Sequence, residues 1–148
     1  MTLCSHKRTP LFADPTVADL LVDCCSRIFS DMDLELTVYC VMPDHLHLLL
    51  TSLDGGAEIR QAIERLKQAA GFVHRRISGQ PLWQRSFFDY TLRSDDARDP
   101  VIAYIVNNPM RAGLVTRPEH WPFWGSTHWS REDLLETIAA VGPGRRPG

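Results

Sequence analysis

The stretch YCVMPDHLHLLL, residues 39–50, places two histidines one residue apart in a run of β-branched, aromatic and leucine residues. Met42-Pro43-Asp44 is typical of a turn, so His45 and His47 are expected to open a new strand. Because side chains alternate along a strand, both imidazoles project from one face and the intervening leucines from the other. Two such imidazoles begin a divalent metal site, but a partly buried His-x-His pair without a ligand explains the spacing equally well.

The composition predicts a single soluble globular domain. The chain has 148 residues, enough for one hydrophobic core. No apolar run approaches the length of a membrane span, and the N-terminal MTLCSHKRTP lacks the apolar core of a signal peptide. The four cysteines form neither a Cys-x-x-Cys motif nor a zinc-like spacing. We therefore expect reduced core cysteines and a cytoplasmic location.

Residues 59–93 form a basic region on an acidic background. They hold seven Lys and Arg residues against Glu64 and Asp89, a balance of +5, and the formal charge of the whole chain is −2, which leaves −7 elsewhere. Such a region is expected of a surface that binds nucleic acid, but a solvated helix face has the same composition. The charges alone leave both interpretations open.

Hydrophobic periodicity predicts strands and helices of an α+β domain. Asp14-Pro15 and Asp99-Pro100 are typical helix starts, an N-cap followed by proline at the first helical position. The order β-α-β-β-α-β and then a helix matches the ferredoxin-like split β-α-β plan, an antiparallel sheet with helices on one face and its first and third strands central. Residues 1–130 are expected to form this domain, and 131–148 a short helix and a disordered tail. The expected elements are strands at 2–8, 34–41, 45–51 and 83–93, and helices at 15–31, 59–77, 100–108 and 131–140.

Tyr104 and Asn108 are four residues apart on a predicted helix, so they share one helix face. An amide oxygen is a suitable third ligand for a hard divalent ion that two imidazoles already hold. A tyrosine hydroxyl next to such an ion can act as a nucleophile. The alternative, a helix tyrosine that only packs on the sheet, remains open at this level.

Three motifs decide between these alternatives: MPDHLHLLL, LWQRSFFDYTLR and YIVNNPMRAGLV. In this order and spacing the chain resembles the REP-associated tyrosine transposases, small relatives of the single-tyrosine HUH transposases of insertion sequences. The resemblance covers about residues 2–127. It implies the HUH endonuclease fold, with a metal-binding pair at His45 and His47 and a metal-facing amide at Asn108. It also implies that Tyr104, on a helix that follows the sheet, is the catalytic tyrosine, and that the metal is Mg²⁺ or Mn²⁺.

The resemblance further implies a reaction and a partner. The metal would polarise the scissile phosphate of single-stranded DNA, and Tyr104 would attack it to give a 5′-phosphotyrosine link and a free 3′-OH. Because that link keeps the bond energy, another 3′-OH can reverse the step, which is DNA transposition by cleavage and rejoining. The expected substrate is hairpin-forming repeat DNA with a single-stranded foot, bound by a monomer or a homodimer. Its phosphates are expected to contact Arg60, Lys67, Arg75, Arg76, Arg85 and Arg93, with Trp83, Phe87 or Phe88 as stacking candidates.

Two other functions compete with DNA transposition as explanations of this sequence. Histidine-triad nucleotide hydrolases also begin with His-x-His on a strand, but their third alternating histidine would fall on Leu49, which speaks against that class. The second is a catalytically inactive protein that only binds repeat hairpins. The presence of all four expected site residues favours the enzyme.

Overall fold

The computed structural model describes residues 1–52, 56–85 and 98–143. The predicted strands at 34–41 and 45–51 and the four predicted helices are present, together with three short 3-10 helices at His6–Arg8, Leu11–Ala13 and Pro118–His120. The remaining elements, in chain order, are β1 (Thr2–Cys4), α1 (Pro15–Asp31), β2 (Glu35–Val41), β3 (His45–Thr51), α2 (Gly56–Ser78), α3 (Arg98–Val106), α4 (Asn108–Arg111), β4 (Trp124–Gly125) and α5 (Arg131–Val141).

The histidine strand lies inside an antiparallel sheet. Within the described residues the strand order is β1-β3-β2-β4, so β3 is paired on both sides, as predicted, whereas β1, which was also expected to be central, lies at an edge of this sheet. His47 stands opposite Thr2 of β1 and Cys40 of β2. The β2–β3 hairpin turns at the predicted Met-Pro-Asp sequence, where the Met42 N–H donates to the carbonyl of His45 at 2.8 Å. Pairing on both sides fixes the register of β3, and therefore which of its side chains face which way.

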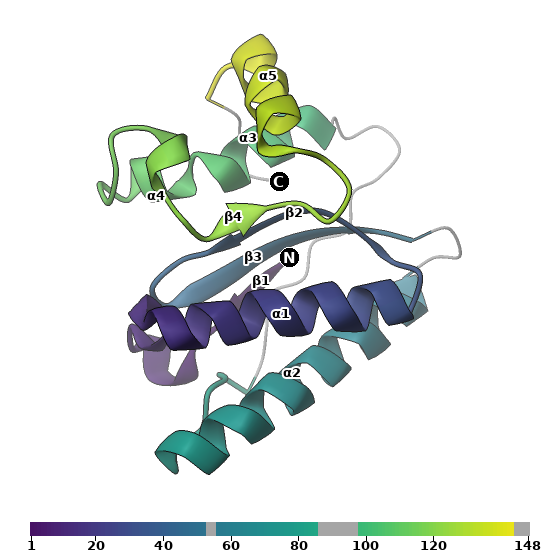
Figure 1. Ribbon diagram of the computed structural model, residues 1–148, viewed down its shortest axis with the longest axis vertical. Coiled ribbons are helices and arrows are strands. Elements are labelled where there is room, and N and C mark those ends of the chain that lie inside the picture. Colours follow the sequence, from purple (N-terminus) through teal and green to yellow (C-terminus); the bar gives the residue numbers. More distant parts are fainter. Residues whose placement is uncertain (53–55, 86–97, 144–148) are drawn as a thin grey trace.

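The two faces of the sheet carry different helices (Figure 1). Helices α1 and α2 cover one face, as the ferredoxin-like plan predicts, and α3 and α5 lie on the other. Leu46 and Leu48 belong to the core cluster with α1 and α2. Because the strand has period two, His45 and His47 project to the opposite face, towards α3.

Helices α1 and α5 begin at capping residues that can be recognised in the sequence, and α2 buries the apolar face that its periodicity indicates. Asp14 caps α1 by accepting from the N–H of Thr16 at 2.9 Å, and Pro15 occupies the first helical position, as predicted. In α2 the apolar stripe is buried at Ala62, Ile63, Leu66 and Ala70. Ser130 caps α5 in a capping box with Asp133. Local sequence therefore accounts for these helices without tertiary information.

The first predicted strand, 2–8, is wrong in its second half. β1 ends at Cys4, and residues 6–8 form a 3-10 turn in which Lys7 and Arg8 have φ of 54° and 55°. Backbone in this left-handed region cannot continue a strand ladder. The turn is tied to the rest of the protein by the bridge between Ser5 and Trp83 and by the bond from the Ser5 N–H to the carbonyl of Asp44.

Other differences concern the second half of the chain. Most of the predicted strand 83–93 falls within residues 86–97, which lie outside the described residues. The predicted disordered tail beyond residue 143 also lies outside them. α3 begins at Arg98, two residues before the predicted start, and it ends at Val106. An unpredicted strand, β4, pairs with the edge of β2. Its Trp124 is fully buried, and the indole Nε1 donates to the carbonyl of Pro118 at 2.9 Å.

Within the described residues, no helix is long and apolar enough to cross a membrane.

Leu48→Ala is expected to lower the free energy of unfolding by about 2–5 kcal/mol, because it creates a cavity at a fully buried position of β3. Urea denaturation followed by circular dichroism measures the change. Leu114→Ala, at a position that is 45% exposed, is the control and is expected to change stability by less than about 0.5 kcal/mol. Equal losses in the two variants would contradict the register of β3.

Candidate metal and tyrosine site

The two histidines form a pair whose outer nitrogens converge. The Nε2 atoms of His45 and His47 are 3.1 Å apart, and the two rings meet nearly at right angles, with centroids 4.7 Å apart. His47 is buried at 8% exposure, and the His45 side chain is 16% exposed. Both rings are therefore largely shielded from solvent, and we call the region around their two Nε2 atoms the recess.

Each imidazole is held by its other nitrogen. His45 Nδ1 lies 2.6 Å from Oδ1 of Asp44, and His47 Nδ1 lies 3.1 Å from Oγ1 of Thr2 on β1. An ionised carboxylate only accepts, so Nδ1 of His45 carries the proton and its Nε2 presents a lone pair. Partners of this kind fix the tautomer and orientation of histidines that bind metals.

Arg8 supports the carboxylate of Asp44 from the far side. Its Nε and Nη2 donate to Oδ2 at 3.1 and 3.0 Å. Partial burial acts to raise the pKa of Asp44, but the hydrogen bonds and charges of His45 and Arg8 outweigh it and the pKa is lowered. The left-handed turn at Arg8 thus serves the site, because it directs this guanidinium to the carboxylate that orients His45.

Tyr104 and Asn108 reach the same recess from the other half of the chain. The Asn108 amide Nδ2 is 2.9 Å from Nε2 of His47, and the Tyr104 ring lies 6.0 Å from the His47 ring, between centroids. The predicted single helix is divided, since α3 ends before Asn107 and Asn108 begins α4. Asn107 nevertheless keeps helical dihedrals (φ −81°, ψ −2°), so the two side chains still share a face.

The donors around His47 suit a divalent cation. If its Nε2 accepts from the Asn108 amide, two imidazole lone pairs face one another at 3.1 Å, an arrangement that a cation between them stabilises. Turning the amide by half a turn brings its oxygen to the same place. Neighbouring ligands of an octahedral Mg²⁺ with bonds of about 2.1 Å lie roughly 3 Å apart, close to the 3.1 and 2.9 Å separations found at this nitrogen.

No group of three or more His, Cys, Asp or Glu side chains that could hold a metal ion is present in the described part of the chain. Among the described residues, the Asn108 amide is placed next to the histidine pair and can supply a third ligand. Such a site leaves further coordination positions for oxygen atoms of a ligand.

Sequence reasoning missed Arg111. Its guanidinium carbon lies 4.5 Å over the ring of Tyr104, and Nη2 donates to the carbonyl of Pro143 at 2.6 Å. Tyr104, Asn108 and Arg111 are spaced i, i+4 and i+7, so helical periodicity could have found it. Thr2 and Arg8 were also missed, and Asp44 was interpreted as part of the turn without a partner being named. The contacts of Thr2 and Arg8 join distant segments of the chain.

Four of the six predicted DNA contacts lie on a helix across the sheet from the histidines' partners on α3 and α4. Arg60, Lys67, Arg75 and Arg76 lie on α2, across the sheet from Tyr104 (Figure 1). Lys67 is half-buried, its Nζ donates to the carbonyl of Gln84 at 3.1 Å, and burial lowers its pKa. Arg85 is exposed just after Trp83, whereas Arg93 lies outside the described residues.

Of the three residues expected to stack on bases, only Trp83 lies among the described residues. The ring of Trp83 meets Phe12 edge-on, with centroids 5.5 Å apart, and its Nε1 donates to the carbonyl of Lys67. Trp83 therefore packs within the domain, and its ring is not free to act as an isolated surface on which a base stacks. Phe87 and Phe88 lie outside the described residues.

Comparison with known proteins gives a consistent result. A family model described as "Transposase IS200 like" matches residues 1–108. The "REP-associated tyrosine transposase" of Escherichia coli (strain K12) is 25% identical over 97 residues, which cover 66% of this chain and 57% of that protein. A second curated relative, from Haemophilus influenzae, is 30% identical over 100 residues, 60% of this chain and 57% of its own length. The chain thus spans little more than half the length of these relatives.

A solved structure has the same fold. The REP-associated tyrosine transposase bound to a REP hairpin superposes with a TM-score of 0.67, at 22% identity, over 83% of this chain and 72% of that one. At this identity the likeness is evidence for the fold, and it confirms the α+β architecture expected from the sequence.

Asp44→Ala is expected to shift the neutral His45 ring from the Nδ1–H tautomer towards the Nε2–H tautomer, because its hydrogen-bond acceptor is lost. Long-range ¹H–¹⁵N NMR of the metal-free protein reads the tautomer of each imidazole. His47, held by Thr2, is the internal control and is expected to keep its tautomer. An unchanged His45 tautomer would mean that Asp44 does not orient the ring.

Proposed function

The chain belongs to the family of IS200-like transposases, and on that premise we propose that it is a metal-dependent, single-stranded DNA endonuclease and strand transferase. Its substrate would be hairpin-containing repeat DNA, and its nucleophile Tyr104. The observation that carries this proposal is the convergence of Tyr104, Asn108 and the two histidines, from segments about sixty residues apart, in one recess.

The metal would be held by Nε2 of His45, Nε2 of His47 and the amide oxygen of Asn108, with Mg²⁺ or Mn²⁺ as the ion. Oxygen and imidazole donors suit these ions, and the separations of the donor atoms fit their coordination geometry. When bound, the ion supplies positive charge for the non-bridging oxygens of the scissile phosphate. Asp44 keeps the Nε2 lone pair of His45 directed towards the ion, and Thr2 holds the His47 ring in place through its Nδ1.

Tyr104 would cleave the strand by in-line attack of its Oη on phosphorus. The phenol loses its proton, a phosphorus–oxygen bond to the tyrosine forms, and the bond to the 3′ oxygen breaks, so that a 5′-phosphotyrosine and a protonated 3′-OH result. The phosphodiester is exchanged and not hydrolysed, so a second 3′-OH can attack the link and restore a strand without ATP. His47 and Arg111 restrict the tyrosine ring on two sides, which reduces the entropy lost at attack.

The site takes all its side chains from one copy of the chain. Tyr104 lies at the histidines of its own chain, so a monomer can assemble a complete site and exchange of the tyrosine helix within a dimer is not required. A homodimer with two such sites remains compatible with the proposal.

The DNA would contact both faces of the sheet. A relative of this fold has been solved with a REP hairpin, which supports a hairpin substrate. Four of the six predicted phosphate contacts are on α2, while the nucleophile is on α3, on the other face of the sheet. We therefore propose that the folded stem and the cleaved single strand lie on different faces. The proposed phosphate contacts are Arg60, Lys67, Arg75, Arg76, Arg85 and Arg93.

Incubation with a labelled single-stranded hairpin oligonucleotide and Mn²⁺ is expected to give a covalent protein–DNA band on a denaturing gel. The band should be absent from Tyr104→Phe, which lacks the nucleophilic oxygen, and absent with EDTA. Tyr39→Phe, which alters a tyrosine of β2 outside the recess, is the matched control and should retain the band. A band that survives Tyr104→Phe would overturn the nucleophile assignment, and tight hairpin binding without any band would favour the alternative of a protein that only binds.

Metal binding is tested separately from catalysis. In the absence of DNA, His47→Ala is expected to weaken Mn²⁺ binding by at least about tenfold, measured by the loss of the free-ion signal in electron paramagnetic resonance. His120→Ala, an exposed histidine on the 3-10 helix Pro118–His120, should bind Mn²⁺ like the wild type. Equal affinities in the two variants would exclude the histidine pair as the metal site.

A further inference from the structure

We propose that the hollow between α2 and the segment that follows it binds an unpaired DNA base, with Phe72 as the stacking surface. The hollow has a volume of about 480 Å³, within the usual range for ligand sites. Lys67, Gly71, Phe72, Arg75, Leu82 and Trp83 line it. The choice of DNA as the ligand rests on the proposed function; the site itself rests on the observations below.

Phe72 is a large apolar side chain that is exposed to solvent and takes no part in the core. Its side chain is 63% exposed, whereas the apolar stripe of α2 is already buried against the sheet and α1. The guanidinium of Arg76, one turn later, lies 5.7 Å over the ring. An exposed aromatic ring flanked by arginine is the arrangement with which proteins bind single-stranded nucleic acid, because every base offers a face for stacking.

The floor of the hollow is rigid and apolar. Leu82 is buried, and Trp83 is fixed by Phe12 and by the hydrogen bond from its Nε1 to the carbonyl of Lys67. Gly71 allows the Trp83 ring to pack closely against α2, since a Cβ there would lie only 3.3 Å from Cδ1 of Trp83. This close packing helps to fix Trp83 beside the hollow.

The charge around the hollow favours an anion. From residue 65 to residue 88 the sequence has no Asp or Glu, while Lys67 and Arg75 border the hollow directly. Phosphates on either side of a stacked base would meet only positive side chains of this segment.

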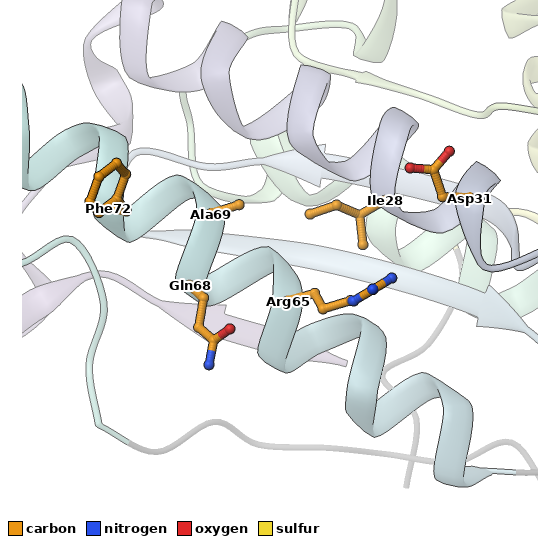
Figure 2. Close-up of a pocket in the computed structure, with 6 residues that line it drawn as sticks. All are labelled: Ile28, Asp31, Arg65, Gln68, Ala69 and Phe72. Carbon is orange, nitrogen blue, oxygen red and sulfur yellow. The ribbon is translucent and has the colours of Figure 1, made fainter.

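A second hollow, on the other side of α2, is less suitable. Figure 2 shows this space of about 570 Å³ between α1 and α2, bordered by the same Phe72. Asp31 also borders it, opposite Arg65, and its carboxylate would repel a phosphate. The nucleotide is therefore assigned to the side of Leu82 and Trp83.

A second copy of the chain is the competing occupant, because Val73 and Ile77 add exposed apolar surface to the same helix. In a twofold contact, however, the same patch meets itself, so Arg75 and Arg76 of each copy would approach the arginines of the other. Such like-charge contacts oppose association, while DNA removes the repulsion.

The test measures binding by fluorescence anisotropy, with a fluorescein-labelled DNA hairpin that carries an unpaired tail of mixed sequence. The full chain with Tyr104→Phe is used throughout, so that no strand is cut. Adding Phe72→Ala is expected to weaken binding at least about fivefold, the range found for loss of one stacking contact. Adding Phe72→Trp should restore it. Ile77→Ala, which removes a 77% exposed apolar side chain of the same helix outside the hollow, is the matched control and should change binding less than twofold.

The DNA provides the second half of the test. An abasic residue at the stacked position should weaken binding of the wild-type side chain as much as Phe72→Ala does, and combining the two should add nothing further. The inference fails if Phe72→Ala and Ile77→Ala bind equally well. It also fails if Phe72→Ala is equally weak on a fully paired duplex, or if sedimentation shows a dimer that Phe72→Ala dissociates. A Phe72 effect without any covalent band from the Tyr104 enzyme would preserve this site and refute the proposed catalysis.

Discussion

The alternation of side chains along β3 is the constraint on which the rest of the structure depends. Leu46 and Leu48 enter the core beneath α1 and α2, and the histidines between and before them necessarily face the other way. A register slip of one residue would bury the imidazoles in that core and expose the leucines. Because β3 is paired with both β1 and β2, such a slip would also break two ladders. The hydrophobic core and the position of the histidine pair are therefore two consequences of one register.

A polar recess next to a core is stable only if its hydrogen-bonding groups are satisfied. Here the Nδ1 atoms of both histidines have partners, and the Asp44 carboxylate is in turn held by Arg8. An unpartnered buried polar group costs about 1–3 kcal/mol, so these contacts matter to folding as well as to chemistry. The two strained residues of the N-terminal turn, Lys7 and Arg8, fit the same view, because backbone strain of this kind collects near functional sites.

The sheet separates two surfaces with different properties. On one face, a short α3–α4 unit presents Tyr104, Asn108 and Arg111 to the histidines. On the other, α2 presents basic side chains and the exposed ring of Phe72 to solvent. A substrate that is partly folded and partly single-stranded can use both surfaces at once. Under the proposed function, the sheet would set the distance between the bound stem and the cleaved bond, and a rigid spacer of that kind is what selection of a cleavage position requires.

Sequence alone determined the features that depend on neighbours in the chain. Period two put His45 and His47 on one face, the Asp-Pro cap began α1, and the i, i+4 spacing paired Tyr104 with Asn108, because strand and helix geometry are local. Contacts between distant segments were decided by tertiary structure: Thr2 reaches His47 through the β1–β3 ladder, Arg8 reaches Asp44 through an unforeseen turn, and β4 pairs with β2. The tertiary structure also decided which side chains are exposed. Trp83 and Phe72 are both aromatic residues of the basic region, but packing partly buries Trp83 and leaves Phe72 exposed to solvent. Periodicity states which side of an element a residue occupies, but what lies opposite that side depends on how the elements assemble.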